Sequence, residues 1–333
     1  MHHFCTYFNI NYLPRARVLA ASLEAYCPSY HLHALCFDEL SFTRMRELNL
    51  PHVTPIALAD FEAAYPALTA VKASRSLVEY FYTCGPNLPL YVFSQVPDAN
   101  AVTYVDADLC FFSNPQPLFD AQEGHSVSVT AHHLPDFRSK YKLCRHTGFY
   151  NVGWLTFQRD HDGIACLEWW RERCLEWCYE RFEDNKYADQ LYLDQWPGLF
   201  PGFFEHIHHG ANVALWNVGD YHFSLRNEKV FCDDDPLIFY HFHALKQVTK
   251  RIFNTNLSVS FRPPHPIVKQ KIYVPYIKQL QAFVEEEYPV TGSIRRFHVR
   301  SVAAQWVRDV FRIVLGIVLR QYIYVKNDRI HGS

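Results

Sequence analysis

The sequence predicts an α/β protein with a mixed, mainly parallel sheet flanked by helices, followed by a helical C-terminal extension. Short apolar segments rich in β-branched and aromatic residues alternate with segments of helical periodicity along residues 1–250. This alternation is typical of strands joined by crossover helices. Of the 333 residues, 49% are hydrophobic and 16% are aromatic, which excludes a disordered chain. The net charge of −2 gives the whole protein no reason to bind nucleic acid.

The first third of the chain predicts three strands and two helices in alternation. Pro14 suits the first turn of a helix, and Val18 and Leu23 behind it fall on one helical face. We therefore expect strands at 3–8, 31–37 and 52–56 and helices at 15–26 and 42–48.

Further along, the same patterns predict a buried strand that begins at Ala101 and a polar, mobile loop over residues 132–144. The tryptophans of the segment 161–182 recur at helical spacing, which is typical of core packing. The remaining expected elements are helices at 69–82, 88–95, 161–182 and 276–287, strands at 126–131 and 236–243, and a strand that follows Gly153.

Two carboxylates appear where the strand from Ala101 should reach the surface. Asp106 and Asp108 are two residues apart, so on an extended segment both side chains point to one side and can reach one ion. Mg²⁺ and Mn²⁺ take such oxygen ligands together with substrate phosphates. In an open α/β sheet, ligands bind at the carboxyl ends of the strands, where this pair falls. A turn or helix cap is the alternative role of a bare Asp-x-Asp.

Glycine is scarce, with 12 residues in the chain, and neither a Gly-x-Gly-x-x-Gly fingerprint nor a Walker A loop is present. A bound nucleotide would therefore need another anchor for its diphosphate. A metal ion held by carboxylates is the obvious one.

The apolar strand, Asp106-Ala107-Asp108 and the following Phe111-Phe112 resemble the metal-binding signature of GT-A glycosyltransferases, the nucleotide-sugar-dependent enzymes. Residues 1–250 as a whole resemble glycosyltransferase family 8 and related bacterial polysaccharide glycosyltransferases. The resemblance implies a GT-A, Rossmann-like domain, which we expect over residues 1–262. The composition changes from Pro263 onward, where Pro263, Pro264 and Pro266 indicate a boundary, and we expect a helical extension over residues 263–333.

For the nucleotide, the resemblance implies that Asn9 and Tyr12, in the turn after the first strand, contact a uracil base, with Thr6 nearby. In the resembling families a basic residue of the later helix approaches the donor phosphates or the first aspartate. Lys72 and Arg75 share a helix face there, and Arg75 is preferred because its planar fork can pair at two points. A solvated basic face is the alternative.

For the donor sugar, Asn151, in an Asn-x-Gly turn with Gly153, resembles a family asparagine that touches the sugar. Asp189-Gln190 resembles a family pair that faces the sugar hydroxyls and the reacting carbon, so Asp189 and Gln190 are the expected catalytic residues. Asn212 is the polar group expected in a loop on the acceptor or sugar side.

The end of this domain resembles the family's closing His-aromatic-x-Gly motif, whose histidine completes the metal site and whose lysine meets the diphosphate. His241 is the expected third ligand, with His243 left open because both lie on one side of a strand. Lys246 is the expected phosphate contact. The sequence departs from the family motif at two positions. Ala244 stands where glycine is expected, and Lys246 comes one residue earlier than the family lysine.

The resemblance implies transfer of a hexose from a nucleotide diphosphate sugar, with a UDP-sugar favoured, to a glycan or lipid-linked hydroxyl, with retention of configuration. Mn²⁺ or Mg²⁺ is the implied cofactor. An inverting reaction, a metal-dependent nucleotidyltransferase or phosphohydrolase, and a non-catalytic nucleotide-sugar-binding protein stay open as alternatives. The nucleotidyltransferase and phosphohydrolase would favour a Gly-rich loop or more clustered carboxylates.

The expected location is cytoplasmic, since no export signal is visible and the ten cysteines are expected as reduced core thiols. A helix at 302–324 carries Arg308, Arg312 and Arg320 among apolar residues. Such a basic amphipathic helix can lie on the inner face of an anionic membrane, cap the core or form a dimer contact.

Overall fold

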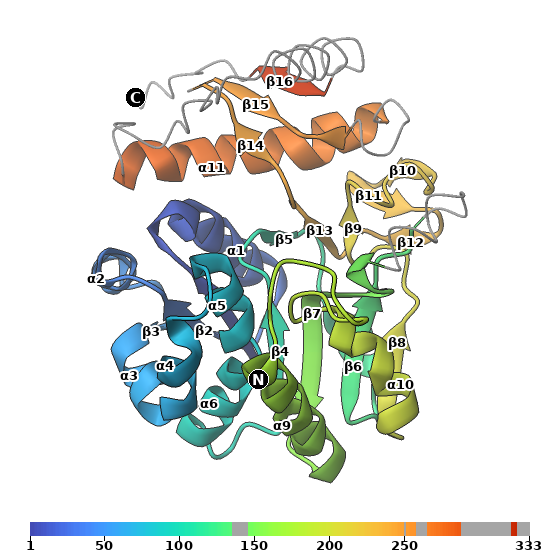
Figure 1. The fold of residues 1–333 in the computed structure, drawn as a ribbon. Helices are drawn as coiled ribbons and strands as arrows, with labels where there is room; N and C mark the ends of the chain where they lie inside the picture. The colour runs from blue at the N-terminus through green and yellow to red at the C-terminus, as the bar shows by residue number, and fades with distance from the viewer. Residues whose placement is uncertain (135–145, 250, 258–264, 288–320, 325–333) are drawn as a thin grey trace, which may run out of the picture.

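The computed structural model describes residues 1–134, 146–249, 251–257, 265–287 and 321–324. Its centre is a seven-stranded sheet in the order β3-β2-β1-β4-β7-β6-β8. Figure 1 shows helices packed around this sheet and a long helix crossing one end of it. The strands are β1 (His2–Phe8), β2 (Tyr30–Cys36), β3 (Val53–Ala57), β4 (Ala101–Val105), β6 (Val127–Ala131), β7 (Tyr150–Gln158) and β8 (Phe203–His206).

The sheet is mixed and mainly parallel, as the alternating sequence pattern predicts. Strands β3, β2, β1 and β4 pair in parallel, and β6 pairs in parallel with β8. Strand β7 runs antiparallel to both β4 and β6. The carboxyl ends of β1 and β4 therefore meet at one edge of the sheet, which is where the Asp-x-Asp segment begins.

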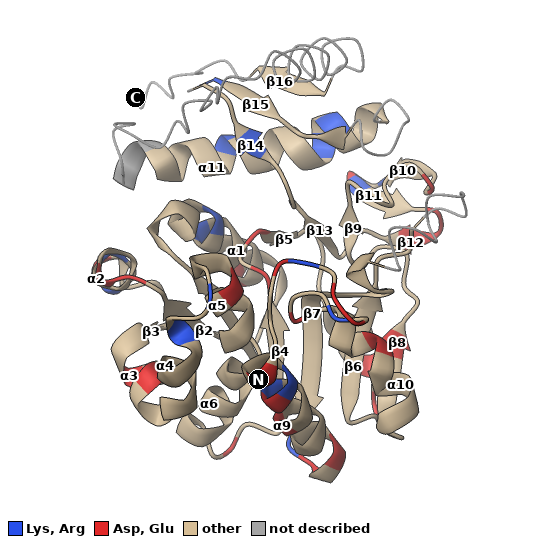
Figure 2. Ribbon diagram, in the orientation of Figure 1, with Lys and Arg blue, Asp and Glu red and all other residues tan. Residues whose placement is uncertain are grey.

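Both faces of the sheet are apolar because helices cover both. Phe4 of β1 packs with Leu19 and Leu23 of α1 (Leu13–Tyr26), whereas its neighbour Cys5 lies in the core formed with α6 (Asn87–Gln95) and α9 (His161–Glu176). Of the seven strands, β8 is the only one that contains Asp, Glu, Lys or Arg. Figure 2 shows this charge-poor centre, with the charged residues mostly on helices and loops.

Several predicted elements have different bounds in the structure, among them two helices and one strand. The segment predicted as one helix, 69–82, forms α4 (Pro66–Lys72) and α5 (Leu77–Cys84), because Ser76 and Glu79 form a reciprocal capping box that starts a new helix. The helix predicted to reach residue 182 ends at Glu176, since Trp177 adopts an extended backbone. The strand predicted at 236–243 is shorter and forms β13 (Phe239–His241).

The C-terminal region packs against the first helix and forms a common core with it. Helix α11 (Val274–Glu287) contributes Tyr276 and Ile277 to a cluster that also contains Val18 of α1. The guanidinium of Arg17 lies 4.0 Å from the centre of the Phe283 ring. A division into two domains near residue 262 stays a prediction, and its boundary lies outside the described residues.

The helix predicted at 302–324 is wrong at its end, because Tyr322–Tyr324 form strand β16, which pairs with β15 (Ile252–Asn254). Residues 302–320, including the arginines of that prediction, lie outside the described residues, as does most of the loop predicted at 132–144. Within the part of the chain that the structure describes, no helix is both long and apolar enough to span a bilayer. The nine cysteines of that part are all buried and free.

Asp38 fixes the turn that follows β1. One carboxylate oxygen accepts from the backbone N–H of Ser41 at 2.8 Å and caps α2 (Glu39–Leu48), and the other accepts from the N–H of Ile10 at 2.8 Å. We expect Asp38→Ala to lower the free energy of unfolding by about 1–2 kcal/mol, measured by urea denaturation. Glu39→Ala, which removes a neighbouring exposed charge, should cost about 0.5 kcal/mol or less. Equal losses in the two variants would contradict this role of Asp38.

Candidate active site

Asp106, Asp108 and His241 meet at the carboxyl end of β4. The two aspartates lie in the turn between β4 and β5 (Leu109–Phe111), and β5 pairs antiparallel with β13, with His241 opposite Leu109. Nε2 of His241 lies 3.2 Å from Oδ1 of Asp108 and 3.5 Å from Oδ2 of Asp106. One potential ligand atom from each residue lies within 4.8 Å of the others. The short β5–β13 pairing thus closes a three-residue cluster.

The electrostatics of this cluster are those of two carboxylates that share one positive charge. Burial alone would raise the pKa of Asp108, but His241 and Arg15 hold it well below its ordinary value. Burial raises the pKa of Asp106, and the Asp108 charge adds to this effect while His241 opposes it. Burial would lower the pKa of His241, but the two carboxylates raise it. The two carboxylates therefore favour a positive charge at this place, either on the imidazole or on a bound cation.

The residues present fit a divalent ion. Two carboxylates and one imidazole converge on one point, as the ligands of one metal ion do. His243, the open alternative, is exposed and is not part of the converging group, and its ring lies 5.8 Å from that of His241. The geometry therefore favours His241 as the third ligand.

Arg15 belongs to this cluster, and no sequence motif points to it. Its Nη1 lies 3.7 Å from Oδ2 of Asp108, and its Nη2 donates to the carbonyl of Leu245 at 2.6 Å. The same guanidinium lies 4.8 Å from the centre of the Tyr12 ring. The only feature of the sequence that could have drawn attention to Arg15 is its position directly after Pro14, in the first turn of the helix. Only the fold shows that this turn faces Asp108.

The residues expected at the nucleotide lie at the same edge of the sheet. Thr6 is fully buried in β1, and its hydroxyl has no hydrogen-bond partner among the described residues. Asn9 follows that strand, and its side-chain oxygen accepts from the N–H of Asn11 at 3.2 Å. Tyr12 is 43% exposed, which leaves its ring open to a ligand, and the charge of Asp108 is the main cause that raises its pKa. The turn after β1 therefore lies beside the aspartates.

The structure does not bring the predicted basic residues to the aspartates. Lys72 forms an ion pair with Glu62 at 2.6 Å. The guanidinium of Arg75 lies 4.1 Å from the centre of the Tyr179 ring and donates to the carbonyl of Leu175 at 3.2 Å. Lys246 is exposed in β14 (Lys246–Gln247), next to the residue whose carbonyl Arg15 binds. Among the described residues, Arg15 is the arginine that contacts Asp108.

Asn151 and Gly153 lie inside β7, and the turn predicted at this point is wrong. Val129 pairs with Leu155 whereas Thr130 pairs with Asn151, so residues 152–154 form a bulge. The side-chain oxygen of Asn151 accepts from the N–H of Gly153 at 3.0 Å, which holds the bulge in shape. The strand is irregular there because the extra residues have no partner on β6.

The bulge is held by Gln190 and faces His241. The side-chain oxygen of Gln190 accepts from Nδ2 of Asn151 at 3.1 Å, and its Nε2 donates to the carbonyl of Thr147 at 2.6 Å. A Cβ on Gly153 would lie 3.0 Å from Nδ1 of His241. Asn151 and Gln190 are therefore bonded to each other and to the backbone around the cluster.

Asp189 is buried, and its Oδ2 has no hydrogen-bond partner among the described residues. Burial, and secondarily the charge of Asp106, raise its pKa to about 8. The preceding residue, Ala188, has a φ of 48°, a strained conformation for a residue with a Cβ. A buried carboxyl with a raised pKa, an open oxygen and a strained neighbour is typical of a functional site.

The pKa of Asp189 predicts a pH dependence of stability. Its pKa is raised from 3.8 to about 8, so between these values the folded chain keeps a proton that the unfolded chain loses. We expect this group to lower stability as pH rises through the window, by at most about 1.4 kcal/mol per pH unit. Asp189→Asn should remove that contribution, measured by urea denaturation of metal-free protein at several pH values. An identical pH dependence in both proteins would contradict the shift.

Further polar and aromatic groups surround the cluster. Asn212 is fully buried with a φ of 54°, and its Nδ2 donates to the carbonyl of Ala131 at 3.0 Å. Its Oδ1 has no partner among the described residues. The Trp216 ring lies 5.2 Å from the rings of both His132 and His241. The sequence singled out neither Trp216, which lies in the loop predicted on the acceptor or sugar side, nor His132, since neither belongs to a motif.

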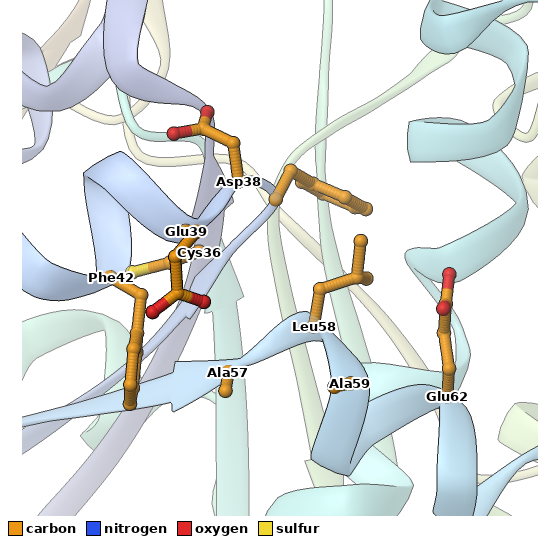
Figure 3. A pocket seen from close by; sticks show the side chains of 9 residues that line it. Cys36, Asp38, Glu39, Phe42, Ala57, Leu58, Ala59 and Glu62 are labelled. Carbon is orange, nitrogen blue, oxygen red and sulfur yellow. The ribbon is translucent and has the colours of Figure 1, made fainter.

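A separate pocket lies at the carboxyl ends of β2 and β3, with a volume of about 260 Å³. Figure 3 shows its lining, which includes Phe42, Leu58 and the acidic residues Asp38, Glu39 and Glu62. The residues that line it include no Lys or Arg. Such a lining disfavours a diphosphate.

Comparison with solved structures identifies the class of fold. The galactosyltransferase LgtC, solved with donor and acceptor sugar analogs, superimposes with a TM-score of 0.50 at 15% identity, over 86% of this chain and 100% of that chain. The protein thus has the GT-A glycosyltransferase fold. No family model matches the sequence.

Two proteins of Bacillus subtilis (strain 168) are similar in sequence. The uncharacterized protein YfnD is 31% identical over 287 residues, which cover 85% of this chain and 90% of YfnD. The uncharacterized protein YfnF is 35% identical over 256 residues, which cover 74% of this chain and 82% of YfnF. The chain belongs to the family of YfnD and YfnF.

Proposed function

We propose that the protein is a metal-dependent glycosyltransferase that moves a hexose from a nucleotide diphosphate sugar, UDP-linked, to a hydroxyl of a glycan or lipid-linked acceptor. The observation that carries this proposal is the convergence of Asp106, Asp108 and His241 at the carboxyl edge of a GT-A sheet. A cation-binding centre at this edge suits a diphosphate bridged by a metal ion.

Asp106, Asp108 and His241 would hold Mn²⁺ or Mg²⁺. Such an ion neutralises the charge that builds on a leaving diphosphate. Arg15 helps to keep Asp108 ionised, and its hydrogen bond to Leu245 fixes the chain next to Lys246. Lys246, exposed next to the residue whose carbonyl Arg15 binds, is our candidate for the diphosphate contact. Lys72 and Arg75, the other basic candidates, contact Glu62 and the carbonyl of Leu175 instead.

We assign the base to Asn9 and Tyr12, with Thr6 nearby, because this turn adjoins the aspartates and leaves the Tyr12 ring open. Asp189 is the candidate that faces the reacting carbon, since its Oδ2 is buried without a partner among the described residues. The donor sugar would be lined by three amides, those of Gln190, Asn151 and Asn212.

The proposed reaction retains the anomeric configuration by front-face attack, with the leaving phosphate assisting the acceptor hydroxyl. Asp189 or Gln190 would then stabilise the oxocarbenium-like centre electrostatically. A cytoplasmic enzyme of polysaccharide assembly, with its C-terminal region at the inner face of the membrane, is the setting we propose. The division into a GT-A domain at 1–262 and an extension at 263–333 belongs to the same proposal.

A thermal-shift screen of nucleotides and nucleotide sugars, with and without Mn²⁺, tests the proposal. A ligand that binds only the native state raises the melting temperature, by an amount that grows with its concentration relative to Kd. We expect UDP or a UDP-sugar to stabilise the protein and chelation to remove the effect. Stabilisation by GDP alone would overturn the base assignment, and no shift with any nucleotide would overturn the proposed function.

A further inference from the structure

Three histidines gather on one face of β1 and β2, away from the carboxyl end of β4 where the candidate active site lies. His31 and His33 are two residues apart on β2, so their side chains leave the same face. His3 is the parallel partner of His31 in the neighbouring strand. Their ring contacts show that all three imidazoles lie together.

His3 and His33, which share a hydrogen bond, are close enough to bind one ion together, whereas His31 does not yet converge on them. Nδ1 of His3 and Nε2 of His33 are 3.2 Å apart. Two imidazole ligands of a tetrahedral Zn²⁺ lie roughly 3.3–3.4 Å apart, so the pair already has the spacing of two ligands. The His31 ring lies 4.8 Å from that of His33 and 6.3 Å from that of His3.

Burial favours the neutral form of these imidazoles, which is the form that binds metal. Burial is the main cause that lowers the pKa of His3, His31 and His33, and it takes that of His33 to about 3. The neighbouring His52 lowers the pKa of His31 further. Nδ1 of His52 lies 3.1 Å from Oε2 of Glu24.

We propose that His3, His31 and His33 form a second metal site, for a divalent ion that prefers imidazole ligands, with Zn²⁺ as the expected ion. His3 and His33 supply the preformed pair. His31, which is only partly buried, joins them by releasing its 2.8 Å hydrogen bond to Oγ1 of Thr54 and turning toward His33. The proposal does not depend on the glycosyltransferase function, because it concerns different residues and a softer set of ligands.

A bound ion would tie β1 to β2 and stabilise the fold. The test is isothermal titration of Zn²⁺ into the full chain carrying Asp108→Asn, which removes one of the three ligands of the carboxylate cluster, together with a thermal-shift measurement. We expect about one equivalent to bind and the melting temperature to rise. Adding His31→Gln should weaken binding by roughly tenfold or more and remove the rise in melting temperature.

His52→Gln in the same Asp108→Asn background is the matched control, since His52 is a neighbouring exposed histidine that pairs with Glu24. Zn²⁺ affinity should then equal that of the Asp108→Asn protein. Absence of saturable binding in the Asp108→Asn protein would overturn the proposal. Equal affinity with and without His31→Gln would overturn it as well, because the ion would then be bound elsewhere.

Discussion

Asp108→Asn is expected to abolish the Mn²⁺-dependent stabilisation by the nucleotide sugar and to lower turnover by roughly 10³-fold or more. The substitution keeps the shape of the side chain but removes the charge that faces both Nε2 of His241 and the guanidinium of Arg15. Without that carboxylate the cluster keeps two of its three charged or basic ligands. Thermal shift with and without Mn²⁺, and release of the nucleotide product, measure the effect.

Asp120→Asn is a suitable control for this prediction, since Asp120 is an exposed acid on α7 (Gln116–Ala121) that accepts from the side chain of Gln116. Its stabilisation by the same ligands should equal that of the unmodified protein. In metal-free protein, Asp108→Asn should also lower the pKa of His241, because Asp108 is the main group that raises it. Undiminished Mn²⁺-dependent binding in Asp108→Asn would contradict the metal assignment.

Gly153→Ala is expected to disturb the site through packing alone. The added Cβ would lie 2.6 Å from Oδ1 of Asn151 and 3.0 Å from Nδ1 of His241, both on buried side chains. Relief of these contacts requires movement of the β7 bulge or of His241. We expect a loss of roughly 1–3 kcal/mol in the free energy of unfolding, measured by urea denaturation, and roughly 10²-fold weaker turnover.

Gly198→Ala separates this effect from a general cost of replacing glycine. A Cβ on Gly198, in α10 (Trp196–Leu199), would meet no atom within 4 Å. We expect its stability to stay within about 0.5 kcal/mol of the unmodified protein and its ligand binding to be unaltered. If Gly153→Ala behaved like Gly198→Ala, His241 would not be held as closely against β7 as the structure indicates.

The sequence was most informative about the strands and least informative about where helices stop. The apolar runs that became β1, β2, β4 and β6 were recognisable because strands buried on both faces are almost continuously hydrophobic. The break before Ser76 and the end of α9 at Glu176 were missed, since the helical pattern continues across both points. Helix ends of this kind are set by capping side chains and by local backbone conformation, even where the hydrophobic periodicity continues.

The candidate site divides in a similar way. Asp106 and Asp108 could be paired from the two-residue period of an extended segment, because that relation is local. His241 was reached through a resemblance, and Arg15 was not reached at all. Both lie far from the aspartates along the chain and are brought to them by the β5–β13 pairing and by the packing of α1.

Local patterns along the chain account for the α/β class, the parallel strands and the place of the two aspartates at a strand end, because hydrophobic periodicity and strand geometry act over a few residues. Which groups face those aspartates follows from the packing of distant segments. That packing selected His241 and Arg15, directed Lys72 and Arg75 to other partners, and gathered the histidines of β1 and β2 on one face. Such contacts depend on how the strands pair across the whole sheet, and local sequence patterns do not predict that pairing.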